Sequence, residues 1–447
     1  MRDVLAQKKN LHRILCINLK LGYSYNNMNV IKKVDSKLVA LDLAHSKFSG
    51  EGLVGLDINL PMLEKLDLAD CPYLTIEGVR ELLIRCSATL KDLDLKGTNI
   101  CGEGLENVPV LKLEKLCLYK CLNLTNAGII QLIAKSSATL KVIDLTLTDI
   151  SGEGLEAVPF LKLVKLNLSF CRKLTNTVIQ ELLAKCSATL KDINLTRTDI
   201  SGESLDSVSV LKLEKLILVN CRNLTNKGLL ELLAKCSATL KDINLSDTDI
   251  SGESLDSAPV LKLNKVKMSN CENLTNTGLL QLLAKCTTLK VLDLTGTNIS
   301  GEGLESLPVL KLETLNLKLC RNMTNAGLLQ FLIKCSATLK DLNLSKSDIS
   351  GEGLEGAPVL KLERLNLENC RNLTNTGLLE LLTKCSETLE DLNLDETDIC
   401  RKSIKKVPFL KLDENGYRLP PARLPVFPVS RIGPSERESL RRLLKKT

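Results

Sequence analysis

A window as long as residues 190–239 recurs along most of this 447-residue chain. The window contains two units, which begin at Leu190 and Leu213 and each open with the pattern L-x-x-[LI]-x-L. Each unit carries a small hydrogen-bond donor, Thr198 or Cys221, three residues after that pattern. Self-similarity at a fixed period is the signature of a repeat array, in which each unit buries its apolar face against its neighbours. We therefore expect one elongated array of stacked units.

Fifteen units of this kind open between residues 38 and 412, and two unit lengths alternate. The unit that begins at Leu90 has 23 residues, and the unit that begins at Leu113 has 27. Terminal repeats are atypical because they cover exposed core, so residues 1–37 are predicted to form a degenerate N-terminal cap repeat. We expect residues 413–447 to form a flexible, Pro-rich basic tail with a short C-terminal helix.

Each unit is predicted to begin with a short strand. Alternate residues of a strand face opposite sides, so Leu216 points into the array while Lys215, Ile217 and Val219 point outward. A helix with Thr225 as its N-cap follows in the longer units, whereas the shorter units have room for only one or two turns. The connections return every strand in the same direction, and the bulkier helices must lie outside. The predicted fold is an α/β solenoid, a right-handed horseshoe with a parallel sheet on its concave face and helices and short turns on its convex face.

Seventeen cysteines are present, and thirteen of them occupy two fixed repeat positions, represented by Cys221 and Cys236. Units without Cys at the first position carry Thr or Ser there, such as Thr198, so the shared property is a hydrogen-bond donor. We therefore predict a hydrogen-bonding ladder, with no disulfide framework and no metal site. Free thiols favour a reducing compartment, so we expect the protein in the cytoplasm or the nucleus.

The charge and composition exclude other classes of function. The net charge is +7, but residues 413–447 supply eight Arg/Lys and four Asp/Glu, so the rest is nearly balanced and nucleic-acid binding is not expected. No apolar run of about eighteen residues occurs, so we predict no membrane span and at most weak membrane contact through the basic tail. His12 and His45 are the only histidines, and the acidic residues are periodic, so neither a catalytic centre nor a cofactor is predicted.

The longer unit resembles the cysteine-containing leucine-rich repeat, L-x-x-L-x-L-x-x-C-x-x-L-T-x-x-G-L-x-x-L-x-x-x-C, which residues 213–236 and 362–385 match throughout. This repeat is found in F-box leucine-rich-repeat proteins, which recruit substrates to ubiquitin ligases. The resemblance implies a non-catalytic horseshoe that selects substrates within a Skp1/cullin-type ligase assembly. Residues 1–37 lack the helical pattern of an F-box, so the ligase-docking element would be missing or supplied separately. The alternating unit lengths also resemble ribonuclease-inhibitor-like arrays, which implies an inhibitor or sensor as the alternative.

Outward strand positions are where we expect the function to lie. One column alternates in charge between neighbouring strands, as at Lys165, Asp192 and Lys215, which predicts a ladder of exposed ion pairs. Some outward positions carry apolar residues instead of charged ones. Clusters of exposed apolar residues often mark interfaces, and aromatic residues and Arg are common interface hot spots. Neutral drift of the repeats is the alternative explanation. The candidate protein-binding patch on the concave face comprises Tyr119, Val142, Leu147, Phe170, Arg197, Ile217 and Val219.

Overall fold

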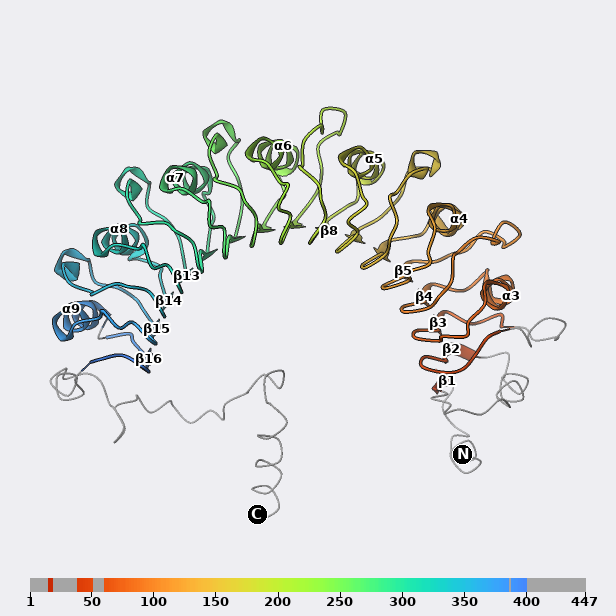
Figure 1. Ribbon diagram of the computed structural model, residues 1–447, viewed down its shortest axis with the longest axis horizontal. Coiled ribbons are helices and arrows are strands. Elements are labelled where there is room, and N and C mark those ends of the chain that lie inside the picture. The colour runs from red at the N-terminus through yellow and green to blue at the C-terminus, as the bar shows by residue number, and fades with distance from the viewer. Residues whose placement is uncertain (1–14, 19–37, 51–59, 386, 400–447) are drawn as a thin grey trace, which may run out of the picture.

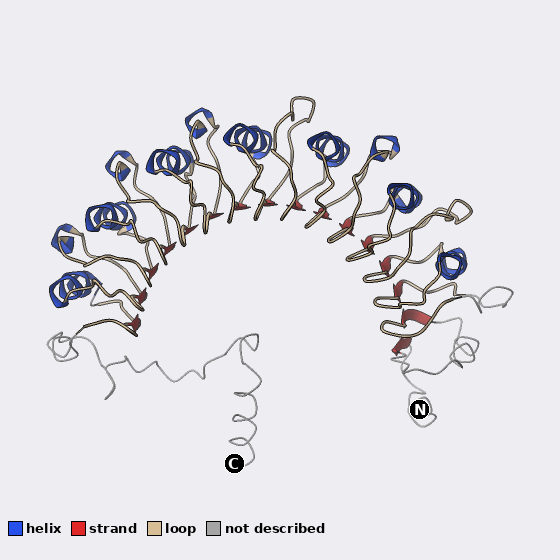
Figure 2. Cartoon of the chain, viewed as in Figure 1, coloured by secondary structure: helices blue, strands red, loops and turns tan. Residues whose placement is uncertain are grey.

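The computed structural model describes residues 15–18, 38–50, 60–385 and 387–399, which form an open arc of repeats (Figure 1). The described part contains sixteen strands in one parallel sheet, and their order in the sheet is their order in the chain. The strands line the inner rim of the arc, and the helices lie on its outer rim (Figure 2). The predicted α/β solenoid, with a parallel sheet on the concave face and helices on the convex face, is confirmed.

The strands are short, and those from β3 onward have three residues each. They are β1 (Leu15–Asn18), β2 (Leu38–Asp42), β3 (Lys65–Asp67), β4 (Asp92–Asp94), β5 (Lys115–Cys117), β6 (Val142–Asp144), β7 (Lys165–Asn167), β8 (Asp192–Asn194), β9 (Lys215–Ile217), β10 (Asp242–Asn244), β11 (Lys265–Lys267), β12 (Val291–Asp293), β13 (Thr314–Asn316), β14 (Asp341–Asn343), β15 (Arg364–Asn366) and β16 (Asp391–Asn393).

Helices alternate in kind along the outer rim, as the two unit lengths predict. The α-helices of the longer units are α3 (Ile76–Cys86), α4 (Asn126–Ser136), α5 (Asn176–Cys186), α6 (Asn226–Cys236), α7 (Asn276–Lys285), α8 (Asn325–Cys335) and α9 (Asn375–Cys385). Single 3₁₀ turns occur in shorter units: η2 (Leu155–Ala157), η3 (Leu255–Ser257), η4 (Leu304–Ser306) and η5 (Leu354–Gly356).

The central residue of each strand builds the core. Ile193 of β8 pairs with Leu216 of β9, which pairs in turn with Ile243 of β10. These three side chains are buried within one apolar cluster that extends from Leu38 to Leu392. Each unit therefore buries its leucines against its neighbours, which is how a repeat array is stabilised without a central globular core.

The T-x-x-G segment of the longer units determines how each helix starts. The Oγ1 of Thr125 accepts a hydrogen bond of 3.0 Å from the N–H of Gly128, and the predicted N-cap Thr225 does the same for Gly228 at 2.9 Å. Gly128 is pressed against the preceding unit, because a Cβ added there would lie 2.2 Å from the carbonyl oxygen of Cys101. The N-cap starts the helix, and the glycine lets it pack closely against the preceding unit.

Cysteines at the first repeat position form the predicted hydrogen-bonding ladder. The Sγ of Cys221 donates to the carbonyl of Leu195 in the preceding unit at 3.0 Å, and Thr198 Oγ1 donates to the same carbonyl at 2.7 Å. The two side-chain donors, from adjacent units, share this buried carbonyl with the N–H of Thr198 at 3.2 Å. Cys236, at the second position, donates instead to the Leu232 carbonyl of its own helix at 2.9 Å. A bond like that of Cys221 is made by Cys71, Cys121, Cys171, Cys271, Cys320 and Cys370.

Only part of the predicted N-terminal cap is described. Within residues 1–37, β1 joins the sheet beside β2, with Cys16 opposite Ala40 and Ile17 opposite Leu41. The predicted tail at residues 413–447 lies outside the described residues, as does the end of the last predicted unit.

Candidate functional site

Charged residues open most strands of the concave face, and some of them form the predicted ion pairs. Lys165 Nζ lies 3.2 Å from Asp192 Oδ2, and Arg364 Nη2 lies 3.0 Å from Asp341 Oδ2. Exposed pairs of this kind contribute only about 0–1 kcal/mol each. The ladder therefore keeps the concave face polar and adds little to the stability of the fold.

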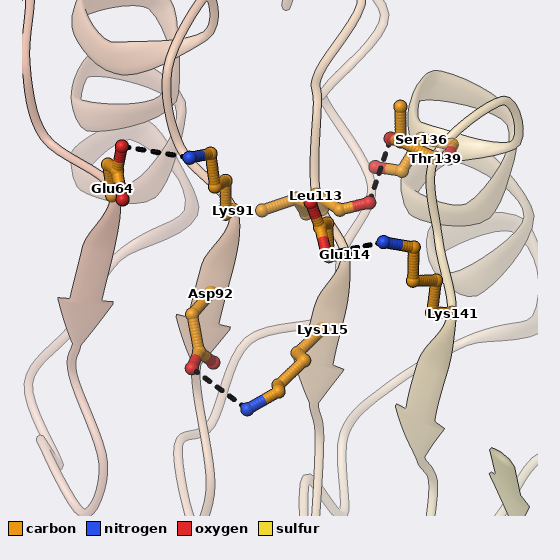
Figure 3. A network of polar contacts seen from close by, with 9 residues as sticks. All are labelled: Glu64, Lys91, Asp92, Leu113, Glu114, Lys115, Ser136, Thr139 and Lys141. Atoms are coloured by element: carbon orange, nitrogen blue, oxygen red, sulfur yellow. Dashed lines mark hydrogen bonds and ion pairs between the residues drawn. The ribbon is translucent and has the colours of Figure 1, made fainter. Parts of the chain in front are cut away.

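A second charge ladder, which the sequence reasoning missed, lies one residue before the strands (Figure 3). Glu214 binds two lysines of the flanking units, Lys191 at 2.8 Å and Lys241 at 2.7 Å. Hydrogen bonds from these two lysines lower the pKa of the Glu214 carboxyl to about 2. The sequence signal is the alternation of L-E-K-L with L-K-D-L, in which both polar positions change sign from unit to unit. The first pairs of this ladder, each at 2.8 Å, are Glu64–Lys91 and Glu114–Lys141.

In each of the two charge ladders, a valine replaces a charged residue, and the two valines lie at neighbouring strands. Val142 opens β6 opposite Lys165 of β7, and Val164 precedes β7 and donates its N–H to the Lys141 carbonyl at 2.7 Å. Both valines are half-buried. Val164 extends the apolar break around Val142, and it is absent from the sequence-predicted patch.

A shallow hollow of about 280 Å³ spans the concave face from β6 to β9, and we call it the β6–β9 hollow. Val142 lies at one end and Ile217 at the other, so two of the predicted residues line the same depression. The ion pair of Lys165 and Asp192 lies between them. Other outward residues of the hollow are Asp144, Asn167, Asn194 and Lys215. The hollow offers apolar ends and a charged, hydrogen-bonding centre.

Leu147, Phe170 and Arg197 lie in the turns after β6, β7 and β8 rather than on the strands themselves. We call these three residues the carboxyl-edge row. Their φ angles are 58°, 63° and 54°, in the left-handed region, which costs roughly 1–2 kcal/mol for a residue with a side chain. The same turn position holds Gly97 and Asn220 in nearby units, residues that adopt this conformation readily. The backbone is left-handed at this position along the array, and Lys120, Leu319 and Lys346 also occupy it. What distinguishes the carboxyl-edge row is therefore the succession of three bulky side chains in adjacent units.

The carboxyl-edge row is continuous in space. The N–H of Phe170 donates to the Thr196 carbonyl at 2.7 Å, and the N–H of Arg197 donates to the Val219 carbonyl at 2.8 Å. The Arg197 guanidinium carbon lies 5.0 Å from the centre of the Phe170 ring, within the range of a cation–π interaction. Val219 thus extends the row by one unit, next to the hollow residue Ile217.

Tyr119 lies at the other end of the predicted patch, in the turn after β5. The Nζ of Lys96 lies 5.4 Å from its ring centre, and the N–H of Gly97 donates to its carbonyl at 2.8 Å. The structure therefore divides the seven predicted residues into two in the β6–β9 hollow and five in the adjoining turns. Strand alternation alone would turn Leu147, Phe170 and Arg197 inward, because each is an even number of positions from a buried strand residue. They are half-buried or exposed because the chain has already left the strand for a left-handed turn.

Burial holds the thiols at the two cysteine positions of the repeat in their protonated form. Burial raises the pKa of Cys221, and it raises the pKa of Cys117 on β5 to about 12. Cys121, the neighbour of Cys117 in the C-x-x-x-C spacing, donates to the Leu95 carbonyl at 3.1 Å. Within the described ranges, no three residues of the types His, Cys, Asp and Glu come together as a metal site. Every helix in the same part of the chain is too short or too polar to cross a lipid bilayer.

A family model described as "Leucine Rich repeat" matches residues 136–158, 285–307 and 335–356. No curated protein matches the sequence. Among solved structures, the internalin InlF of Listeria monocytogenes is 18% identical over 78% of this chain and 84% of its own, with a TM-score of 0.44. A chain of the yeast Rad7–Elc1 complex is 17% identical over 78% of this chain and 80% of its own, with a TM-score of 0.33. In the TLR13–ssRNA13 complex, a chain is 18% identical over 83% of this chain and 62% of its own, with a TM-score of 0.38.

Each matched segment runs from the end of a longer unit into the following shorter unit. The same junction between a longer and a shorter unit recurs along the array. The parallel strands, the buried in-register leucines and the helices on the convex face are those of an open solenoid. The chain carries leucine-rich repeats that fold into an open α/β solenoid, a scaffold suited to protein–protein interaction.

Proposed function

We propose that the protein is a non-catalytic scaffold that holds one protein partner against the β6–β9 hollow and the carboxyl-edge row. The observation that carries this proposal is the succession of Leu147, Phe170 and Arg197 in three adjacent turns beside the β6–β9 hollow. Packing of the array does not require these side chains, because Gly97 occupies the same turn position after β4. The side chains of Leu147 and Phe170 are half-buried and can be covered further by a partner.

The chemistry of this surface defines what the partner presents. Phe170 and Leu147 offer an apolar edge, and Arg197 is an exposed cation that is already positioned over an aromatic ring. Aromatic and arginine side chains are the most frequent hot spots of interfaces. We therefore expect a partner segment with an apolar side chain beside a carboxylate, which would contact Phe170 and Arg197 together.

Substrate selection for a ubiquitin ligase is the setting we propose. The support is the resemblance of residues 213–236 and 362–385 to the cysteine-containing repeat of F-box leucine-rich-repeat proteins. In this setting the protein acts in the cytoplasm or the nucleus, and it associates with a Skp1/cullin-type assembly. The alternative is an inhibitor or sensor of the ribonuclease-inhibitor kind, which the alternating 23- and 27-residue units favour. A ligase component co-purifies with the Skp1/cullin-type assembly, whereas an inhibitor binds one enzyme tightly and blocks it.

Affinity purification with mass spectrometry tests the binding surface. Tyr119→Ala combined with Phe170→Ala is expected to reduce recovery of the main partner by about tenfold or more, as loss of a hot spot does. The matched control is Tyr73→Ala combined with Leu319→Ala, because Tyr73 is exposed and Leu319 occupies the same left-handed turn after β13. Equal recovery by both double variants would reject the proposed surface.

A further inference from the structure

The shorter units carry an exposed apolar residue at one position, just before the chain enters the next strand. The side chain at this position is between 63% and 82% exposed in six units, although valine and phenylalanine are usually buried. An exposed lysine follows two residues later in each of these units. We call these residues the Val–Lys stripe. It comprises Val110, Phe160, Val210, Val260, Val309 and Val359, with Lys112, Lys162, Lys212, Lys262, Lys311 and Lys361.

The Val–Lys stripe lies on one flat side of the arc. The N–H of Leu161 donates to the carbonyl of Lys185 in the last turn of α5 at 3.2 Å, and Leu211 does the same with Lys235 of α6 at 2.8 Å. Each apolar stripe residue precedes such a leucine, so it lies beside the C-terminal end of a helix. The helices are seen nearly end-on in Figure 2, so their C-terminal ends share one flat side.

The lysines of the stripe are available to a ligand. In the described part of the chain, none of the six makes an ion pair or a side-chain hydrogen bond. Other lysines on this side have partners: Lys141 forms an ion pair with Glu114, and Lys135 donates to the carbonyl of Glu106 and lies near its carboxylate. The stripe lysines therefore add unpaired positive charge to this flat side.

We infer that the Val–Lys stripe docks the protein, by its flat side, on an anionic lipid surface. The apolar residues are separate points that recur at every second strand, roughly 10 Å or more apart, and they do not form one continuous patch. A folded protein would need a complementary contour for each of these points, whereas a fluid planar surface accepts all of them at once. Lysines attract anionic headgroups, and the adjacent apolar side chains enter the interface between headgroups and acyl chains.

Vesicle binding by the full chain tests the electrostatic part of this inference. We expect the protein to co-sediment with phosphatidylcholine vesicles that contain one-third phosphatidylserine, and not with pure phosphatidylcholine. Changing three stripe lysines to Gln should weaken binding by about tenfold or more, since each lysine near such a surface contributes about fivefold. The variant carries Lys162→Gln, Lys212→Gln and Lys311→Gln.

The matched control removes the same charge from the opposite flat side. The opposite side carries three exposed arginines, which lie three residues before the N-caps of α5, α6 and α8, at the other end of these helices. Weakening by this control equal to that of the lysine variant would overturn the inference, as would full binding by the lysine variant or no binding by the unchanged protein. The control variant carries Arg172→Gln, Arg222→Gln and Arg321→Gln.

Fluorescence tests whether the apolar residues enter the lipid. The protein contains no tryptophan, so Phe160→Trp introduces a single probe at a side chain that is 82% exposed. Its emission should shift to the blue on addition of the anionic vesicles. Tyr73→Trp is the control, because Tyr73 is exposed three residues from the N-terminus of α3, on the opposite side. An unchanged Phe160→Trp spectrum, or equal shifts for both probes, would overturn the inference.

Discussion

The guanidinium of Arg197 lies 5.0 Å from the ring centre of Phe170, and the two residues occupy left-handed turns of adjacent units. A cation–π contact at an exposed site contributes about 0.5–1 kcal/mol, which does not exceed the roughly 1–2 kcal/mol that the left-handed backbone costs each residue. The pair is therefore not explained by the stability of the turn. Binding of a partner supplies a reason for both side chains.

Phe170→Asn should separate stability from binding. Asn tolerates the left-handed backbone and already occupies this position at Asn220 and Asn270. We expect the free energy of unfolding, measured by urea denaturation, to stay within about 1 kcal/mol of the unchanged protein. Recovery of the partner in affinity purification should fall sharply. A large loss of stability would instead show that Phe170 is a packing residue.

The helix N-cap and the close glycine should respond differently to alanine. Thr125→Ala removes one hydrogen bond to Gly128 and should lower the free energy of unfolding by about 1 kcal/mol. Gly128→Ala should cost more, because the added Cβ would lie 2.2 Å from the backbone oxygen of Cys101. Gly356→Ala is the control, since its Cβ would make only an ordinary contact at 3.7 Å with Leu329. Equal losses at the two glycines would contradict the proposed packing of the T-x-x-G segment.

The shared Leu195 carbonyl predicts an order of effects for its two side-chain donors. Thr198→Val removes the shorter bond, 2.7 Å from a hydroxyl, and should lower the free energy of unfolding by about 1–2 kcal/mol. Cys221→Ser keeps a donor at the other position and should cost less, because the hydroxyl of Ser347, at the Thr198 position of another unit, donates to the equivalent carbonyl of Leu344. Denaturation curves of the two variants check the order. A more severe effect of Cys221→Ser would mean that sulfur packing, and not hydrogen bonding, selects cysteine.

The pKa of Glu214 should depend on its two lysine partners in the second charge ladder. Because Lys191 and Lys241 lower this pKa to about 2, the stabilising contacts are present above the ordinary glutamate value of about 4.3 and are lost as the pH falls through about 2. Lys191→Gln combined with Lys241→Gln should return the pKa toward the ordinary value in a carboxyl NMR titration. Lys212→Gln is the control and should leave it unchanged. A low pKa in the double variant would contradict the two-lysine contact.

The sequence predicted the array well, because leucine spacing and unit length are direct consequences of stacking. The outward directions of Val142 and Ile217 were also predictable from alternation, and the structure places both in one hollow. The turn positions of Leu147 and Phe170 were not predictable in this way, because the alternation ends where the left-handed backbone begins. Val164 was not predicted, because it lies one residue before the strand, at a position of the second charge ladder. The ion pairs of that ladder join adjacent units and are recognised only when the units are aligned with one another.

Site-specific photo-crosslinking tests the central claim most directly. Phe170 is replaced by p-benzoylphenylalanine in the full chain, and Leu319, in the equivalent turn after β13, is replaced in the control. The proposed surface predicts that one protein partner is crosslinked from position 170 and not from position 319. Equal crosslinking from both positions, or none from position 170 while the partner is still recovered, would contradict binding at the carboxyl-edge row.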